Sequence, residues 1–359
     1  MSPQPEVSVI IVTFNAMPIM TLVERAIKSV LSANYSDFET ILVDNGSNDG
    51  TGTYLQEKYS QELSIYKSPV NLGFAEGNNV GYKLCSRKSK YILLVNSDCV
   101  IEPDAITILV QYIEKHPKVG AAQGILVDLN SRDKISSAGN MLDITGHDYI
   151  RCRYLSTSEC SQESYVSQTA GAMMIIRNSA LNGNLFLKGK FMYGEDLELA
   201  LRLWTKGYRS VALPTVVGHH SWGEASHKLT AMQRILQICL GRNMTSVINT
   251  YWRANSVTKT YLPLMLLQRL TEICYGVTLS SVKPLYAGEA FGLLQRLKIP
   301  IERRNTYAPL LLKSSPVNTI FSPLSYYTFS KKGFSIDVTV TEDDIRASRT
   351  PFIVSKPFD

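Results

Sequence analysis

The apolar run YILLV at residues 91–95 leads directly into Asn96, Ser97 and Asp98. Such a run is typical of a strand buried on both faces, where an unpaired carboxylate is costly. Oxygen-bearing side chains at positions i and i+2 of a turn can together bind a hard cation or sugar hydroxyls. The same residues can instead form an Asx turn ahead of the next helix, so two interpretations are open at this point.

Two adjacent acids, Glu195 and Asp196, begin a predicted helix over residues 194–209. Acids in a first turn complement the helix dipole and cap backbone N–H groups, which is a sufficient structural explanation. Adjacent side chains on a helix also point in different directions. One carboxylate can therefore serve a cleft as a general base while the other binds backbone or substrate.

Two adjacent histidines, His219 and His220, follow a predicted short strand that begins at residue 211. A histidine pair can be purely structural. Alternatively, His219 would complete an oxygen-and-imidazole metal site with Asp98.

The glycine-rich stretch NLGFAEGNNVG at residues 71–81 begins another predicted helix. Backbone amides at such a helix start can face a phosphate, although a plain turn with a helix cap explains the pattern equally well. The stretch matches neither GxGxxG nor GxxxxGK[ST], which excludes the usual dinucleotide-fold and P-loop motifs.

The elements that would position these residues alternate along the chain, strand then helix. This rhythm predicts a parallel, doubly wound sheet, in which ligands bind outside the carboxyl ends of the strands. Polar residues stand at three of those ends: Thr13 with Asn15, Asp44 with Asn45, and Asn96 to Asp98. The predicted strands cover residues 7–14, 38–45, 62–68 and 91–98, with a mixed sheet continuing at 124–129, 170–177 and from 211. A shared rim of polar strand ends favours a cleft at Asp98.

Basic residues are concentrated in one part of this 359-residue chain, whose net charge is +6. Residues 226–305 hold eleven Lys and Arg against three acids, in a pattern we interpret as helical. These helices can be a solvated face or a helix lying on an anionic membrane surface; nucleic acid is disfavoured because glycine and aromatic residues are not interleaved. The sequence shows no apolar stretch long enough to span a bilayer and no signal-peptide pattern at its start.

The six cysteines show no CxxC pair and no zinc-ligand spacing with histidine. We therefore expect reduced cysteines and a cytoplasmic protein.

Seven motifs, taken in order, resemble family 2 glycosyltransferases of the GT-A fold, particularly the rhamnosyltransferase-like branch. They are VSVIIVTFN, ETILVDNGSNDGT, NLGFAEGNN, YILLVNSDCVI, TAGAMMIIR, YGEDLELALRLWTKGYR and VVGHHSWGEAS. The resemblance covers about residues 7–226 and implies an α/β Rossmann-like domain with a mixed, mostly parallel sheet. We expect a glycosyltransferase domain at 1–226, a basic amphipathic helical region at 227–305 and a tail without assigned role at 306–359.

The resemblance implies a role for each candidate residue. Asp196 would be the general base, with Glu195 beside it, and Asp98 and His219 would bind a divalent Mn²⁺ or Mg²⁺. The residues expected to line the donor site are Thr13, Phe14, Asn15, Asp44, Asn71, Gly73, Gly77, Asn78, Asn96 and Ser97. Because Asn96 replaces the first acid of the family's DxD motif, metal affinity is expected to be weak or the metal dispensable.

The activity implied is transfer of a sugar, with inversion, from a nucleoside-diphosphate sugar to a hydroxyl of a glycan or lipid-linked acceptor. The protein would be cytoplasmic or peripheral on the inner face of the membrane, with an oligomer possible. The segment NGNLFLKGKFMYGED departs from the family's Gly-Phe-Asp pattern, so acceptor identity is not carried over. The main alternative is a non-catalytic sugar- or nucleotide-binding scaffold. A nucleotidylyltransferase and a processive synthase are disfavoured, because the GxGxR loop and the QxxRW motif are both missing.

Overall fold

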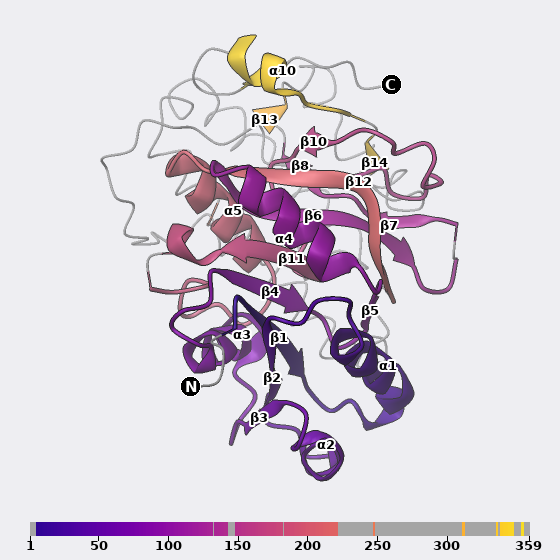
Figure 1. The fold of residues 1–359 in the computed structure, drawn as a ribbon, viewed down its shortest axis with the longest axis vertical. Helices are drawn as coiled ribbons and strands as arrows, with labels where there is room; N and C mark the ends of the chain where they lie inside the picture. The colour runs from indigo at the N-terminus through magenta and orange to yellow at the C-terminus, as the bar shows by residue number, and fades with distance from the viewer. Residues whose placement is uncertain are drawn as a thin grey trace, which may run out of the picture.

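The computed structural model describes residues 5–131, 133–142, 148–181, 183–221, 247, 311–312, 335–336, 338–347 and 353–354. Its first half alternates strands and helices as predicted, with shifts of a few residues at the ends (Figure 1). The strands are β1 (Val7–Thr13), β2 (Phe38–Asp44), β3 (Ser64–Lys67), β4 (Tyr91–Val95) and the short β5 (Cys99–Ile101). The helices are η1 (Met17–Ile19), α1 (Met20–Leu31), α2 (Thr51–Tyr59), α3 (Gly73–Leu84) and α4 (Ala105–Lys115).

The second half adds antiparallel and parallel strands to the same sheet, as expected for a mixed sheet. Its elements are β6 (Val119–Asp128), β7 (Ile135–Ser137), β10 (Ser164–Tyr165), β11 (Met173–Arg177), η2 (Asn178–Ala180), α5 (Glu195–Thr205) and β12 (Arg209–His220). The strand order is β10-β12-β6-β11-β4-β1-β2-β3, with β5 paired to β12 and β7 to β6. β1 is parallel to both β2 and β4, whereas β11 lies antiparallel between β4 and β6.

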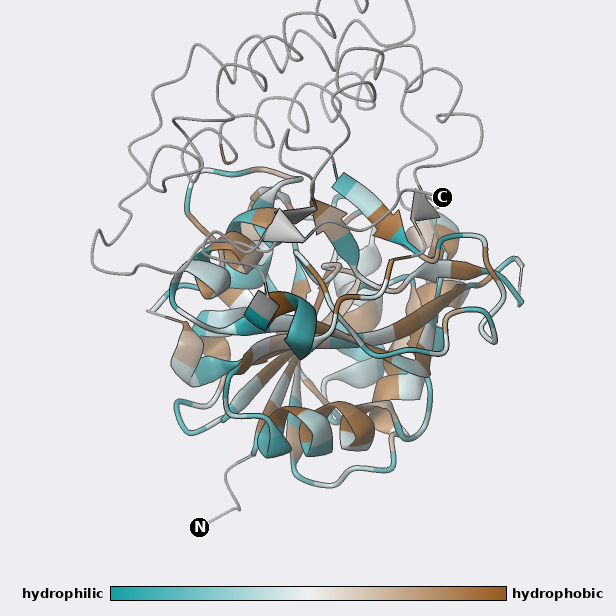
Figure 2. Cartoon of the chain, turned by 90° about the horizontal axis from the view of Figure 1, so that it is seen from above, coloured by the Kyte–Doolittle hydropathy of each residue, from teal (hydrophilic) through white to brown (hydrophobic). Residues whose placement is uncertain are grey.

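The sheet is covered on both faces, which explains why its central strands β1, β4, β6 and β11 are buried almost throughout (Figure 2). Alternate residues of β1 serve different cores: Val9 and Ile11 pack with α1 and α4, and Ile10 packs with α3 and α5. Helical spacing of apolar residues matches this arrangement, since Val23, Ile27 and others of α1 recur every three or four positions on its buried side. The cores therefore fix the strand ends, where the predicted site lies.

A small second sheet lies outside the main one and takes two of its strands from residues 131–168. It consists of β8 (Asn140–Leu142), β9 (Asp148–Arg151) and β14 (Ser335–Ile336), with β9 antiparallel to β8 and parallel to β14. Another pair joins β13 (Leu311–Leu312) to β15 (Ile353–Val354). Short strands of this kind carry too few residues to show a clear sequence period.

The chain's C-terminal part returns to the first domain through residues 338–347, which include α10 (Glu342–Ala347). Val340 N donates to Ser164 Oγ, and Val340 O accepts from Tyr165 N, each at 2.9 Å. Val338, Val340 and Ile345 are buried in a cluster with Trp204 of α5. This part of the expected tail is thus a piece of the domain's core.

We expect Ile345→Ala to lower the free energy of unfolding by about 2–5 kcal/mol, because it leaves a cavity in the cluster around Trp204. Urea denaturation followed by tryptophan fluorescence measures this loss. Asp343→Ala is the matched control, since Asp343 is exposed on the same helix. Equal midpoints for the two variants would show that this segment contributes nothing to the core.

The prediction of reduced cysteines is wrong for Cys152 and Cys160, whose Sγ atoms form a disulfide. Both are buried, and they lie eight residues apart, a spacing that a search for CxxC does not detect. Cys85 and Cys99 are free thiols. The expectation of a cytoplasmic protein therefore loses the support it took from the cysteines.

The predicted basic region at 227–305, with the membrane-surface role proposed for it, lies outside the described residues except for Val247. Within the part of the chain that the structure describes, no helix is both long and apolar enough to cross a membrane.

Candidate active site

The carboxyl ends of β1 and β2 place Thr13 and Asp44 side by side, since the two residues are partners in the parallel register. Both are 2% exposed, and Thr13 Oγ1 and Asp44 Oδ1 have no hydrogen-bond partner among the described residues. Buried polar atoms normally find partners. These two residues, predicted to border a nucleoside, thus form a polar pair that a ligand can satisfy.

Asn45 is a part of this rim that the sequence reasoning did not select as a site residue. Its Nδ2 donates to Asn71 Oδ1 (3.2 Å) and Gly73 O (3.0 Å), and its Oδ1 accepts from Leu72 N (3.1 Å). The side chain is buried. Asn45 therefore fixes the turn before α3 against the end of β2.

The loop after β1 carries the other predicted nucleoside residues. Asn15 has φ of 47°, its N donates to Ser47 Oγ (2.8 Å), and its Oδ1 accepts from Asn48 N (2.9 Å). Asparagine tolerates this left-handed conformation better than most residues. Phe14 remains 37% exposed, so its ring is available for contact with a ligand.

The start of α3 depends on close backbone packing. Gly73 has φ of +81°, and a Cβ there would lie 2.1 Å from Phe191 O, so only glycine fits. A Cβ on Gly77 would meet Val12 Cγ1 at 3.0 Å, which shows how closely α3 approaches β1. Asn78 donates from Nδ2 to Phe74 O (2.9 Å) within its own helix. Two of the residues predicted to bind the sugar donor, Gly77 and Asn78, thus make contacts within the protein.

Asp98 lies beyond β4, in the turn to β5. Its side chain contacts His220 and not His219. At the start of this turn Asn96 N donates to Ala172 O (2.8 Å). Asn96 and Ser97 are both half-buried. Asp98 is 5% exposed, and its Oδ1 lies 3.3 Å from His220 Nε2. The backbone of Asp98 also accepts from Ser221 N (3.2 Å).

His219, the predicted metal ligand, is placed elsewhere. Its Nε2 lies 2.7 Å from Glu102 Oε1, because successive side chains on β12 point to opposite faces of the sheet. His220 is therefore the imidazole beside Asp98. The two adjacent histidines gave no local signal for which of them faces the rim.

Two donors, Asp98 and His220, can bind a divalent cation together from one side. Mg²⁺ and similar ions commonly take few protein ligands and complete their shell with phosphate oxygens and water. Among the described residues no group of three His, Cys, Asp or Glu gathers at one point. The pair therefore fits an ion shared with a diphosphate better than one enclosed by protein.

The two acids at the start of α5 differ in environment. Asp196 is half-buried, with Oδ1 accepting from Leu197 N (2.8 Å) and Oδ2 from Gly171 N (3.5 Å). Burial against the protein raises the pKa of Asp196, and these two backbone N–H groups lower it. Glu195 is 5% exposed, and its burial, followed by the charge of Asp196, raises its pKa to about 8. Asp196 is the less buried of the two carboxylates and the one held by backbone N–H groups, so it is the better candidate for a general base.

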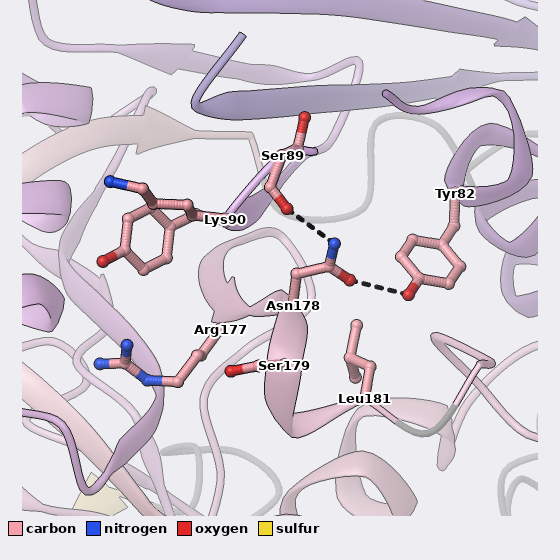
Figure 3. Close-up of a pocket in the computed structure, with 8 residues that line it drawn as sticks. Tyr82, Ser89, Lys90, Arg177, Asn178, Ser179 and Leu181 are labelled. Carbon is pink, nitrogen blue, oxygen red and sulfur yellow. Dashed lines mark hydrogen bonds between the residues drawn. The ribbon is translucent and has the colours of Figure 1, made fainter. Parts of the chain in front are cut away.

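A polar cavity of about 370 Å³ lies at the opposite edge of the sheet, near the start of β4 (Figure 3). Its cations already have partners: Lys90 Nζ donates to Glu6 Oε1 (2.7 Å), and Arg177 Nε donates to Val119 O (2.9 Å). Asn178 there donates to Ser89 O (2.7 Å) and accepts from Tyr82 Oη (2.8 Å). This cavity is separate from the strand ends that carry the candidate chemistry.

Comparison with known proteins points to one family. Residues 8–181, a little under half of the chain, match the family described as Glycosyl transferase family 2. The chain is 30% identical over 160 residues to a poly-β-1,6-N-acetyl-D-glucosamine synthase of Staphylococcus epidermidis, covering 44% of this chain and 37% of that one. It is 25% identical over 206 residues to an uncharacterized glycosyltransferase of Haemophilus influenzae, covering 56% and 60%. The chain thus spans less than two thirds of these relatives.

Solved structures confirm the GT-A fold predicted for the glycosyltransferase domain. A mannosyltransferase from Pyrobaculum calidifontis, in complex with GDP-Man and Mn²⁺, matches with a TM-score of 0.52 at 16% identity, covering 92% of this chain and 82% of that one. GalNAc-T7 with UDP, GalNAc and Mn²⁺ matches with a TM-score of 0.56 at 16% identity, covering 75% and 51%.

Proposed function

We propose that this family 2 glycosyltransferase moves a sugar from a nucleoside-diphosphate sugar to an acceptor hydroxyl by a single displacement, with inversion. The observation that carries the proposal is the pair of unlike carboxyl groups on α5. Asp196 is half-buried and accepts from two backbone N–H groups, whereas burial raises the pKa of Glu195 to about 8. An ionised carboxylate suits a general base, and a base acting without a nucleophilic carboxylate gives a single displacement.

The donor would lie across the carboxyl ends of β1 and β2. Asp44 Oδ1 and Thr13 Oγ1, both lacking partners among the described residues, can hydrogen-bond the N–H and carbonyl groups of a nucleobase. Phe14 offers an exposed ring beside them. Asn71 and Gly73, held by Asn45, would border the ribose and diphosphate.

Asp98 and His220 would hold Mn²⁺ or Mg²⁺ at the diphosphate, and Asn96 and Ser97 would line the same turn. When bound, such an ion supplies positive charge that stabilises the departing diphosphate. Both matched structures with this fold contain Mn²⁺, which supports its choice as a probe.

Asp196 acts on the acceptor. The ionised carboxylate takes the proton of the acceptor hydroxyl. At the same time the hydroxyl oxygen bonds to the anomeric carbon, and the bond from that carbon to the diphosphate oxygen breaks. A single attack from the face opposite the leaving group inverts that carbon, by the same reasoning that applies to inverting glycosidases. Hexosyl and rhamnosyl donors both suit this step, and we propose a glycan or lipid-linked acceptor at a cytoplasmic or peripheral membrane location.

Binding of a donor should be visible as thermal stabilisation. A ligand at one hundred times its dissociation constant adds about 2.7 kcal/mol, which shifts the melting temperature by about 2–4 °C for a protein of this size. UDP-, dTDP- and GDP-sugars are each tested with Mn²⁺, Mg²⁺ or chelator. We expect one nucleotide class to stabilise the protein, and more strongly with metal.

Asp44→Asn is the specificity control, because it replaces one carboxylate oxygen at the proposed nucleobase site with an amide nitrogen. The variant should lose the rise in melting temperature caused by the preferred nucleotide. Failure of every donor to stabilise the wild-type protein, together with no transfer or hydrolysis, would contradict the proposed function. If a donor stabilises the protein equally with metal and with chelator, protein groups alone bind its diphosphate.

A further inference from the structure

Asp148, at the start of β9, is a carboxylate near the base that the proposed reaction does not use. Its Oδ2 accepts from Asn140 Nδ2 (2.8 Å) and from Gln168 Nε2 (3.0 Å), and its Oδ1 is buried without a partner among the described residues. Burial raises the pKa of Asp148 to about 7, and the charge of Asp196 contributes to this rise. Asp148 is thus close enough to Asp196 to sense its ionisation.

The loop from Gln168 to Gly171 connects the two acids. At its first residue, the backbones of Asn140 and Gln168 exchange two hydrogen bonds, of 2.9 and 3.1 Å. In its middle, Ala170 N donates to the Oε1 atom of the fully buried Gln123 (2.5 Å). At its far end, Gly171 N donates to Asp196 Oδ2. Each contact fixes one residue of the loop.

We propose, building on the function above, that Asp148 is a positioning residue for the base: through Gln168 it holds the 168–171 loop so that Gly171 N–H faces Asp196. The donor amides of Asn140 and Gln168 converge on one oxygen of Asp148, so that oxygen anchors β8 and the loop together. The Gly171 contact is long, at 3.5 Å, so it depends on where the loop is held.

The charged groups and N–H donors around Asp196 determine how its pKa would respond to a change in the 168–171 loop. Glu195 lies on the same helix, where Lys190 lowers its pKa, and Asp148 lies across the loop. Gly171 N–H and Leu197 N–H both lower the pKa of Asp196. If the loop relaxes, Asp196 loses the contribution of Gly171, and its pKa moves upward.

The test compares Asp148→Ala with Asp148→Asn in the full-length protein, using whichever donor the binding screen selects. Alanine removes the anchor, and we expect kcat to fall by about 10²-fold, as for a misplaced catalytic group, with donor KM unchanged. The acid limb of the kcat profile should also move to higher pH. Asparagine keeps an oxygen that accepts from both amides, so it should retain most of the activity and the original limb.

Gln168→Ala tests the link from Asp148 to the loop independently. It should show the same fall in kcat and the same shift of the acid limb as Asp148→Ala. The double variant Asp148→Ala/Gln168→Ala should be no worse than either single one, because residues that act along one path are not additive. Asn178→Ala is the matched control: it removes a half-buried hydrogen-bonded amide at the opposite edge of the sheet (Figure 3) and should leave kcat and the pH profile unchanged.

Three results would overturn the inference while leaving the proposed function intact: an unmoved acid limb in both alanine variants, strict additivity in the double variant, or equal loss in Asn178→Ala. A wild-type protein that binds and transfers no donor would instead defeat the proposed function itself. Should Asp148→Ala fail to fold, Gln168→Ala alone decides the question.

Discussion

Replacing Asp196 with asparagine is expected to lower kcat by about 10²–10⁴-fold, the usual contribution of a general base. The amide keeps the size and the oxygen that accepts from Leu197 N, but it cannot take a proton from the acceptor hydroxyl. Donor affinity should be little changed, because the proposed role of Asp196 is contact with the acceptor hydroxyl and not with the nucleoside or the diphosphate. Transfer kinetics and donor binding, measured on the same preparation, separate these two quantities.

The pH dependence follows from the same carboxylate. Burial raises the pKa of Asp196 above its ordinary value, and only the ionised form accepts a proton. The rate should therefore rise with pH through this raised pKa and fall as the solution is acidified below it. Asp196→Asn should lack the limb altogether.

Glu195→Gln provides the comparison within one turn of helix. Because Glu195 holds its proton to about pH 8, the isosteric amide should cost much less activity than the change at Asp196. A larger loss at Glu195 than at Asp196 would reverse the assignment of the base. Normal transfer by Asp196→Asn would remove Asp196 from that role.

The second large effect is expected at His220. We expect His220→Ala to raise the Mn²⁺ concentration for half-maximal transfer by at least about 10–100-fold, the range seen when even indirect ligand partners are lost. The imidazole Nε2 lies 3.3 Å from Asp98 Oδ1, where both can reach one ion. Metal titration of the transfer rate, after removal of bound metal with chelator, measures this shift.

His219→Ala is the control that the sequence itself supplies. His219 contacts Glu102 on the other side of β12, so its loss should leave the metal requirement little changed. Equal shifts in both variants would argue against the register described here. Full activity of the wild-type protein in chelator would show that Asp98 and His220 hold no required ion.

Local patterns in the sequence predicted much of the fold. The strands ending at Thr13, Asp44 and Val95 are apolar runs bounded by polar residues, and each run is long enough to mark a buried strand. Parallel pairing then requires their carboxyl ends to share one edge. The rim was predictable because it depends on strand direction and not on exact pairing.

The parts of the site that were missed depend on contacts between distant segments. His220, and not the predicted ligand His219, lies beside Asp98, because a difference of one residue on a strand reverses the face to which a side chain points. Asp148 meets Asn140 because β8 and β9 pair antiparallel, and it meets Gln168 because that residue pairs with Asn140 in an isolated bridge; neither pairing has a sequence period to predict it. Asn45 was visible as a strand end, but its bonds to the turn before α3 were not.

The return of residues 338–347 to the domain makes its hydrophobic core discontinuous along the chain. Val338, Val340 and Ile345 pack with Trp204, although they lie far from it in the sequence. Closing so long a connection costs little more than closing a shorter one, since each doubling of length adds only about 0.6 kcal/mol. The cluster around Trp204 is therefore complete only when both distant parts of the chain are present.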